Sequence, residues 1–195
     1  MLSKREFDSA MATAAGPVEK VMVFGAVLAR ATRPGPVPVV VGGSAITVIT
    51  GGWCVSGDID VVGPSVRIVP VLQRWGFRLE PDPDGRRYGV RREFGLVVDV
   101  LHRASGSGRS GPLRTFQTMY GPVRVSAIED LIVRRLVFWQ REGRTEYMDQ
   151  AVMLRAKAGR RLDSGYIEGE IRYEKLEEAY AEMNRRARAA DLRSE

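Results

Sequence analysis

Apolar positions in the first half of the chain alternate between helical spacing and short runs typical of buried strands. Pro17 opens a clear helix, PVEKVMVFGAVLARA, because proline is well tolerated at the first helical position. The β-branched run VPVVVG, residues 37–42, predicts a buried strand, and DIDVVG, residues 58–63, predicts the next one. Helices are also expected over residues 4–15, 43–50 and 64–76, the last in spite of Pro70.

The second half begins with a predicted hairpin and then becomes helical. DPDG, residues 82–85, is a turn sequence followed by a strand, and a second apolar strand is expected over residues 96–101. Ser126 and Glu129 have the spacing of a capping box, and Gly143 stands where that helix would end. Further helical segments are predicted over residues 145–159 and 170–190.

This order of elements predicts an α/β (α+β) fold. We expect a mixed β-sheet core flanked by helices in residues 1–125 and a helical C-terminal region in residues 126–195. A chain of 195 residues is long enough for one domain with a full hydrophobic core and a small appendage.

Composition excludes several classes of protein. Hydrophobic residues make up 44% and charged residues 28%, the balance of a globular protein rather than a disordered segment. The chain contains one cysteine and one histidine, which excludes an internal disulfide and Cys/His zinc clusters. No membrane-spanning run is present, and the N-terminus MLSKREFDSAM mixes charges where a secretory signal would be apolar. We therefore expect a cytoplasmic protein.

The formal net charge of +6 is concentrated in one segment. Residues 86–124 contain eight arginines and only two acidic residues, Glu93 and Asp99. Such a segment suits a partner that carries phosphate groups, RNA or tRNA in particular, although solvated arginines on loops and hairpins would give the same pattern.

Two aspartates in the strand predicted at residues 58–63 point to a metal site. Asp58 and Asp60 stand two residues apart, so on a strand both would point to one face, where their like charges require a cation. Asp99 lies in the otherwise apolar run LVVDVL, and a buried acid without a partner would be costly. If the two strands are neighbours, three carboxylates could hold Mg²⁺ or Mn²⁺, which prefer oxygen ligands.

Glycines upstream of these acids are suited to binding phosphate. Gly42, Gly43 and Ser44 lie between a predicted strand and a predicted short helix, where backbone N–H groups can face a triphosphate. The Ser44 hydroxyl adds a donor. Ser56, just before the acids, could donate to a phosphate as well or could simply shape the turn.

Together these residues resemble the nucleotidyltransferase superfamily related to DNA polymerase beta. GGS is followed thirteen residues later by DIDV and then by a lone aspartate in a later strand, and SAIEDLIVRRL is similar to the helix that follows the core in that superfamily. Small stand-alone members, including abortive-infection and toxin-type proteins, are the most similar. The resemblance covers residues 38–101 and, more loosely, 126–158.

The resemblance implies transfer of a nucleoside monophosphate from an NTP to an acceptor hydroxyl. Asp58 and Asp60 would hold two ions, while Asp99 would hold the catalytic ion and help to deprotonate the acceptor. Gly42, Gly43, Ser44, Ser56 and Arg134 would bind the nucleotide. Arg134 and Arg135 stand where relatives often carry a phosphate-binding lysine, and arginine holds phosphate with a different geometry.

Alternatives remain for the function and for one motif. The chain could be an inactive member of this fold that binds nucleic acid or pairs with an antitoxin-like protein, or an enzyme that hydrolyses phosphate bonds with the same metals. The acceptor could be RNA, tRNA, a protein or a small molecule. GSGRSG, residues 106–111, matches a dinucleotide-binding motif, but Pro112 and the brief segment after it leave no room for the crossover helix, so a basic loop that clamps the acceptor is expected instead.

Overall fold

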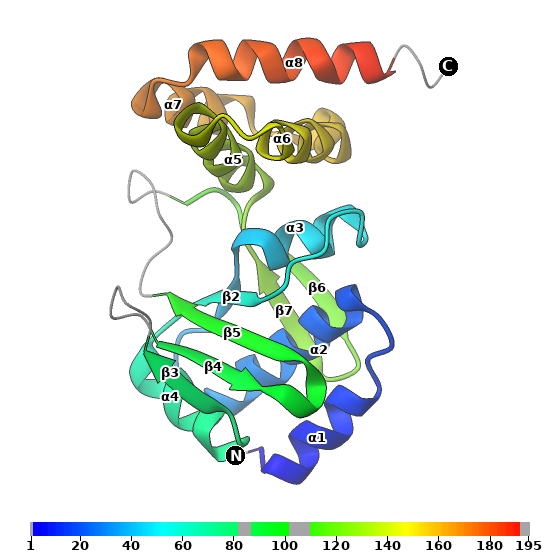
Figure 1. The fold of residues 1–195 in the computed structure, drawn as a ribbon, viewed down its shortest axis with the longest axis vertical. Coiled ribbons are helices and arrows are strands. Elements are labelled where there is room, and N and C mark those ends of the chain that lie inside the picture. The colour runs from blue at the N-terminus through cyan, green and yellow to red at the C-terminus, as the bar shows by residue number, and fades with distance from the viewer. Residues whose placement is uncertain (1, 82–86, 102–109, 192–195) are drawn as a thin grey trace. The chain divides into compact units, whose positions relative to one another are not determined.

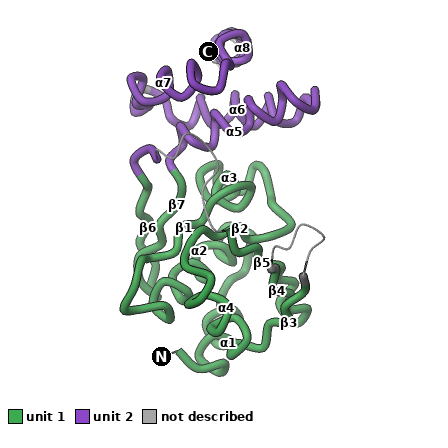
Figure 2. The backbone as a smooth tube through the Cα atoms, turned by 90° about the vertical axis from the view of Figure 1, so that its left-hand side faces the viewer, with its two compact units in different colours: residues 1–104, 113–126 green, residues 105–112, 127–195 purple. Residues whose placement is uncertain are grey.

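The computed structural model describes residues 2–81, 87–101 and 110–191 (Figure 1). The chain forms two compact units (Figure 2). Unit 1 contains residues 1–104 and 113–126, and unit 2 contains residues 105–112 and 127–195. The division into domains at 125/126 stays a prediction, because compactness alone does not establish independent folding.

Unit 1 contains a seven-stranded mixed sheet and four α-helices in its described residues. The sheet order is β3-β4-β5-β2-β1-β7-β6, with β1 parallel to β7, β2 parallel to β5, and the other neighbours antiparallel. The α/β fold with a mixed sheet predicted from the sequence is therefore confirmed. The strands are β1 (Val39–Val40), β2 (Ile59–Val62), β3 (Arg78–Pro81), β4 (Arg87–Arg91), β5 (Leu96–Leu101), β6 (Arg114–Thr118) and β7 (Gly121–Val125), and the helices are α1 (Lys4–Ala12), α2 (Pro17–Ala31), α3 (Gly42–Thr50) and α4 (Ser65–Arg74), with a 3₁₀ turn at Arg92–Phe94.

The two faces of the sheet have different environments. Val40, Val61 and Val98 are buried on the face that α2 and α4 cover, and Gly25 of α2 packs directly on Val40 and Val123. Side chains alternate along a strand, so Asp60 and Asp99 point to the other face, where both are half-buried. The hydrophobic core thus fixes the strands while the acids stay accessible.

An aromatic cluster closes the end of the core beside α1. The rings of Phe7 and Trp75 stack with centroids 4.3 Å apart, and Trp75 is fully buried. The Arg91 guanidinium lies 4.9 Å from the ring centroid of Phe94, is 3% exposed, and forms an ion pair with Asp8 at 2.5 Å. Arg91 is one of the arginines in the basic segment 86–124, and this packing makes it structural rather than available to a ligand.

We expect Asp8→Ala to destabilise unit 1 by about 3 kcal/mol, because it leaves the buried Arg91 guanidinium without its main counter-ion. The same Arg91 guanidinium holds the pKa of Asp8 below its usual range. Urea unfolding followed by circular dichroism measures the effect. Lys4→Ala is the matched control, because Lys4 also pairs with Asp8 but is 55% exposed. Equal losses in the two variants would contradict the assigned importance of Arg91.

Unit 2 is helical in its described residues. Its helices are α5 (Ile128–Glu142), α6 (Thr145–Ala158), α7 (Ser164–Glu174) and α8 (Glu177–Asp191), with a 3₁₀ turn at Gly159–Arg161. No helix among the described residues is long and apolar enough to span a membrane.

Two local predictions for this half of the chain are wrong. The helix predicted over 170–190 is two helices, because Lys175 adopts a left-handed φ of 57° and ends α7. Ser126 does not cap α5: the N-cap is Ala127, and Glu129 is buried and accepts a hydrogen bond from the Asp163 N–H at 2.9 Å. The Glu129 carboxylate therefore binds the start of α7 and does not form a capping box with Ser126.

The last glycine of GSGRSG has a packing role. A Cβ on Gly111 would lie 2.7 Å from Cβ of Ala127 and 3.0 Å from the Tyr166 ring, so only glycine fits. Its N–H donates to the Asp130 carboxylate at 3.2 Å, and the Tyr166 hydroxyl donates to the same carboxylate at 2.5 Å. Residues 102–109, which include most of the predicted acceptor loop, lie outside the described residues.

Burial raises the pKa of Asp130, against the hydrogen bonds from Tyr166 and Gly111 that lower it. The folded chain therefore binds this proton more tightly than the unfolded chain, whose aspartate pKa is about 3.9. Stability from this group falls as pH rises from about 4 through the raised pKa.

Asp130→Asn should remove that part of the pH dependence, so the variant gains stability relative to the parent as pH rises from 4 to 7. Thermal unfolding at several pH values measures the difference, with the exposed Asp149→Asn as control. Parallel curves for the parent and Asp130→Asn would contradict the assignment.

Candidate active site

The turn between β1 and α3 is built around Gly42. Val41 is extended, and Gly42 turns the chain into α3 with a φ of +60°, a conformation that favours glycine. A Cβ at this position would overlap Oδ2 of Asp60 and lie 2.9 Å from its Cγ. The Asp60 carboxylate therefore packs against the backbone of the turn, and both the φ value and the close approach require glycine.

Ser44 connects α3 to the acidic strand. Its side chain is fully buried, its hydroxyl donates to the Val41 carbonyl at 2.9 Å, and it accepts a hydrogen bond from the Asp60 N–H at 3.2 Å. Ser44 thus holds the backbone of Asp60 against the start of α3. Its additional role as a phosphate donor stays a prediction.

The first turn of α3 supplies backbone donors beside this carboxylate. Its N-cap, Val41, provides no side-chain hydrogen bond to the N–H groups that begin the helix. Gly42, Gly43 and Ser44 are the first three residues of α3, and the N-terminus of a helix attracts anions. This end of α3 can therefore accept phosphate oxygens.

Asp60 and Asp99 are direct partners in the sheet. They are paired in the register of the parallel strands β2 and β5, and paired residues on neighbouring strands share a face. Tyr88 of β4 is in turn paired with Asp99, and its hydroxyl donates to Glu80 of β3 at 3.1 Å. Four polar side chains thus follow one another across four strands.

The position of Asp58 in the fold differs from the one predicted from the sequence. Strand β2 begins at Ile59, so Asp58 lies in a bend before it rather than on the strand. Ser56 donates its hydroxyl to the Asp58 carboxylate at 2.8 Å, and the Ser56 N–H donates to Thr47 Oγ1 at 3.0 Å. Ser56 therefore orients Asp58 in this structure, while a contact of Ser56 with nucleotide stays a prediction.

A cleft opens beside Asp58. It has a volume of about 410 Å³ and lies between the start of α2, the bend before β2 and the start of β5. Lys20 and Thr47 line it together with Ser56 and Asp58. Lys20 therefore places a positive charge on the same cleft as the Asp58 carboxylate.

The chemistry and arrangement of the carboxylates decide whether they can hold a metal ion. Residues that the structure describes include no group of three His, Cys, Asp or Glu side chains gathered closely enough to hold a metal ion. Asp60 and Asp99 are brought together, whereas Asp58 is not gathered with them into one cluster. The pair still fits Mg²⁺, which is commonly held by one or two protein carboxylates, waters and the phosphates of a substrate.

Arg134 belongs to unit 2. It lies on α5 with its guanidinium 4.5 Å from the ring centroid of Phe138, and Arg135 lies 5.7 Å from the same ring. The predicted contact of Arg134 with a nucleotide stays a prediction.

Sequence reasoning missed Thr47, Lys20, Tyr88 and Glu80. Thr47 lies one helical turn after Gly43 and donates to the Gly43 carbonyl at 3.1 Å, a spacing that the sequence does contain. Tyr88 and Glu80 carry no such local signal, because their place beside Asp99 depends on the register of β3, β4 and β5.

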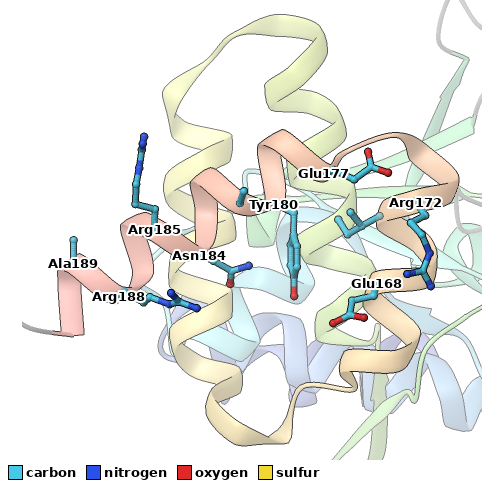
Figure 3. A pocket seen from close by; sticks show the side chains of 10 residues that line it. Glu168, Arg172, Glu177, Tyr180, Asn184, Arg185, Arg188 and Ala189 are labelled. Carbon is cyan, nitrogen blue, oxygen red and sulfur yellow. The ribbon is translucent and has the colours of Figure 1, made fainter.

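Another hollow lies within unit 2, between α7 and α8, and has a volume of about 720 Å³ (Figure 3). Tyr180 and Asn184 of α8 point toward Glu168 of α7 in this view. None of the residues predicted as the active site lines it.

Comparisons with known proteins identify the fold alone. No family model matches the sequence, and no curated protein is similar to it. The crystal structure of an antigenic nucleotidyltransferase-like protein from Paracoccidioides brasiliensis matches with a TM-score of 0.50 and 15% identity, over 69% of this chain and 74% of that chain. The nucleotidyltransferase-like fold expected from the sequence is therefore confirmed, while the abortive-infection or toxin type stays a prediction.

Two structures of the antibiotic-resistance factor ANT(2'')-Ia are also similar. The solution structure has a TM-score of 0.49 and 18% identity, over 92% of this chain and 98% of that chain. The crystal structure in complex with adenylyl-2''-tobramycin has a TM-score of 0.48 and 19% identity, over 84% of this chain and 95% of that chain.

Proposed function

We propose that this protein is a metal-dependent nucleotidyltransferase that moves a nucleoside monophosphate from an NTP to an acceptor hydroxyl. The observation that carries the proposal is the pairing of Asp60 with Asp99, with Asp60 packed against Gly42 at the N-terminus of α3. Carboxylates for a metal and backbone donors for phosphate are thus adjacent, as phosphoryl transfer requires.

In this proposal Asp60 and Asp99 hold Mg²⁺ or Mn²⁺, with Asp58 as a further ligand. When bound there, such an ion would neutralise negative charge on the triphosphate. The N–H groups at the start of α3, from Gly42, Gly43 and Ser44, bind phosphate oxygens and fix the α-phosphate beside the carboxylates.

Asp99 has a second role. Its carboxylate accepts the proton of the acceptor hydroxyl while the acceptor oxygen forms a bond to the α-phosphorus and the bond from that phosphorus to pyrophosphate breaks. Pyrophosphate leaves with the electron pair of the broken bond. Tyr88, the neighbour of Asp99 in the sheet, forms the side of the site toward β3 and β4.

The acceptor is proposed to be RNA, with tRNA included, ahead of a protein or a small molecule. The described arginines of the basic segment that remain exposed support this choice, Arg92 and Arg124 among them. An antitoxin-like protein partner and a cytoplasmic location stay predictions.

A second candidate is a binding module that keeps the fold without turnover. It is favoured by the position of Asp58, which is turned to Ser56 and is not clustered with the other two carboxylates. Such a module would bind RNA in a salt-sensitive way without binding NTP in a Mg²⁺-dependent way.

Incubation with each α-³²P-labelled NTP, Mg²⁺, total RNA and total protein tests the proposal. Radioactivity in an RNA or protein fraction that disappears when Mg²⁺ is chelated is the expected result. Absence of label in both fractions with all four NTPs, together with salt-sensitive RNA binding, would favour the module instead.

A further inference from the structure

A hollow in unit 1, separate from the cleft beside Asp58, is lined by three arginines. It has a volume of about 480 Å³ and is formed by the second half of α2, the segment that follows this helix, and the β6–β7 hairpin. Arg30 comes from α2, Arg33 from the segment after it, and Arg124 from β7. All three side chains are exposed.

The charge around this hollow is of one sign. No carboxylate is among its lining residues, whereas Asp58 lines the cleft and Glu168 and Glu177 line the hollow between α7 and α8 (Figure 3). The ion pairs among the described residues involve none of the three arginines. Three arginines that line one hollow concentrate positive charge there, and this charge attracts an anion.

One of the three arginines, Arg30, also attracts the carboxylate of Glu6. Arg30 contributes to lowering the pKa of Glu6, although the hydrogen bonds from Ser3 are the main cause. Glu6 is fully exposed, so water screens its attraction to Arg30. Arg30 therefore still contributes positive charge to the hollow, as Arg33 and Arg124 do.

Neutral hydrogen-bonding groups complete the lining. Thr115 is the direct cross-strand partner of Arg124, and Gln117 and Tyr120 follow along the hairpin. A hydroxyl or an amide can donate to phosphate oxygens without adding charge, and can also contact a ribose hydroxyl.

We propose that this arginine hollow binds the phosphodiester backbone of an RNA. The proposal rests on the proposed function, because it assigns the acceptor a binding surface on the same sheet as the acids. Strand β7 is two strands from β2 in the sheet, but α2, which lines the hollow, covers the face opposite to Asp60 and Asp99, so an RNA held in the hollow reaches the acids by passing around an edge of the sheet. The three arginines come from α2, from the segment after it and from β7, and a chain of phosphates can contact several such residues at once, whereas one compact phosphate contacts fewer.

Binding of a fluorescein-labelled 20-nucleotide RNA, followed by anisotropy across a salt series, tests this. Replacing Arg30, Arg33 and Arg124 together with alanine should weaken binding by about tenfold or more at low salt. It should also reduce the slope of log affinity against log salt by about 2, since each lost phosphate contact on a single strand removes about 0.7.

The matched control replaces Arg5, Arg141 and Arg161, three exposed arginines outside the hollow and outside the basic segment, and removes the same net charge. This control should change affinity by less than about twofold. Equal weakening of RNA binding in the two triple variants would overturn the proposal, because it would mean that net charge alone attracts RNA. An absence of RNA binding by the parent protein would overturn it as well. Displacement of the RNA by equimolar inorganic triphosphate would also overturn it in favour of a small phosphate site.

The two proposals can fail independently. The arginine variant should keep the Mg²⁺-dependent NTP affinity of the parent, and Asp60→Asn should keep its RNA affinity. If Asp60→Asn lost NTP binding while the arginine variant kept the RNA affinity of the parent, the proposed RNA site in the arginine hollow would be rejected. The proposed function would not be contradicted by that result.

Discussion

Asp60→Asn and Asp99→Asn should each lower the rate of nucleotide transfer by on the order of 10³-fold. Each substitution keeps the shape of the side chain and removes the charge that Asp60 and Asp99 bring together across β2 and β5. The measurement is the initial rate of transfer from the labelled NTP used most efficiently, at saturating Mg²⁺, with circular dichroism to show that the variants fold.

Asp149→Asn is the matched control for this pair, because Asp149 is an exposed aspartate on α6 of unit 2. It should retain the full rate. Activity in Asp60→Asn or Asp99→Asn within about tenfold of the parent would contradict the assignment of the carboxylates.

Gly42→Ala should remove most of the transfer activity and destabilise unit 1 by about 1–2 kcal/mol. The stability loss follows from the left-handed φ of +60°, which costs a residue with a Cβ about that amount. The activity loss follows from the new methyl group, which occupies the space of the Asp60 carboxylate and displaces it from Asp99. Urea unfolding and the same initial-rate assay measure the two effects separately.

Gly57→Ala is the comparison that isolates this contact. Gly57 is adjacent to Asp58, its φ is not in the left-handed region, and a Cβ there would have no atom within 4 Å. We expect near-normal activity and stability. If Gly42→Ala were as active as Gly57→Ala, the packing of Asp60 against the turn would have no functional importance.

The local part of the site could be predicted from the sequence. A β-branched run, two glycines and an acidic strand are close in the chain, so Gly42 and Asp60 are brought together by a short turn and one helix. The helix with Pro70 was also predicted correctly, although Pro70 lies inside α4 and removes one i→i−4 hydrogen bond. Asp99 was identified as a buried-strand acid, but its pairing with Asp60 depends on a sheet register that no local pattern determines.

The remaining errors have physical causes. Asp58 was expected on the strand, but it lies in a bend that Ser56 and Thr47 stabilise. Strand β2 therefore begins at Ile59. The β6–β7 hairpin was not predicted, because its edge strand RTFQT is polar and Pro122 lies in the strand beside it.

Charge was the least reliable guide to the position of a binding surface. Residues 86–124 form a basic run in the sequence, but Arg91 is buried against Phe94 and Asp8. Arg124 instead joins Arg30 and Arg33, which lie far from it in the sequence. Packing, not the density of arginine along the chain, decides which guanidiniums remain available.

The measurement that tests the central claim most directly is isothermal titration of a non-hydrolysable ATP analogue with and without Mg²⁺, in the parent and in the Asp60→Asn/Asp99→Asn double variant. The paired carboxylates predict that Mg²⁺ strengthens binding in the parent and has no effect in the double variant. Equal strengthening by Mg²⁺ in both proteins would contradict the claim that Asp60 and Asp99 form the metal-binding site of a nucleotidyltransferase.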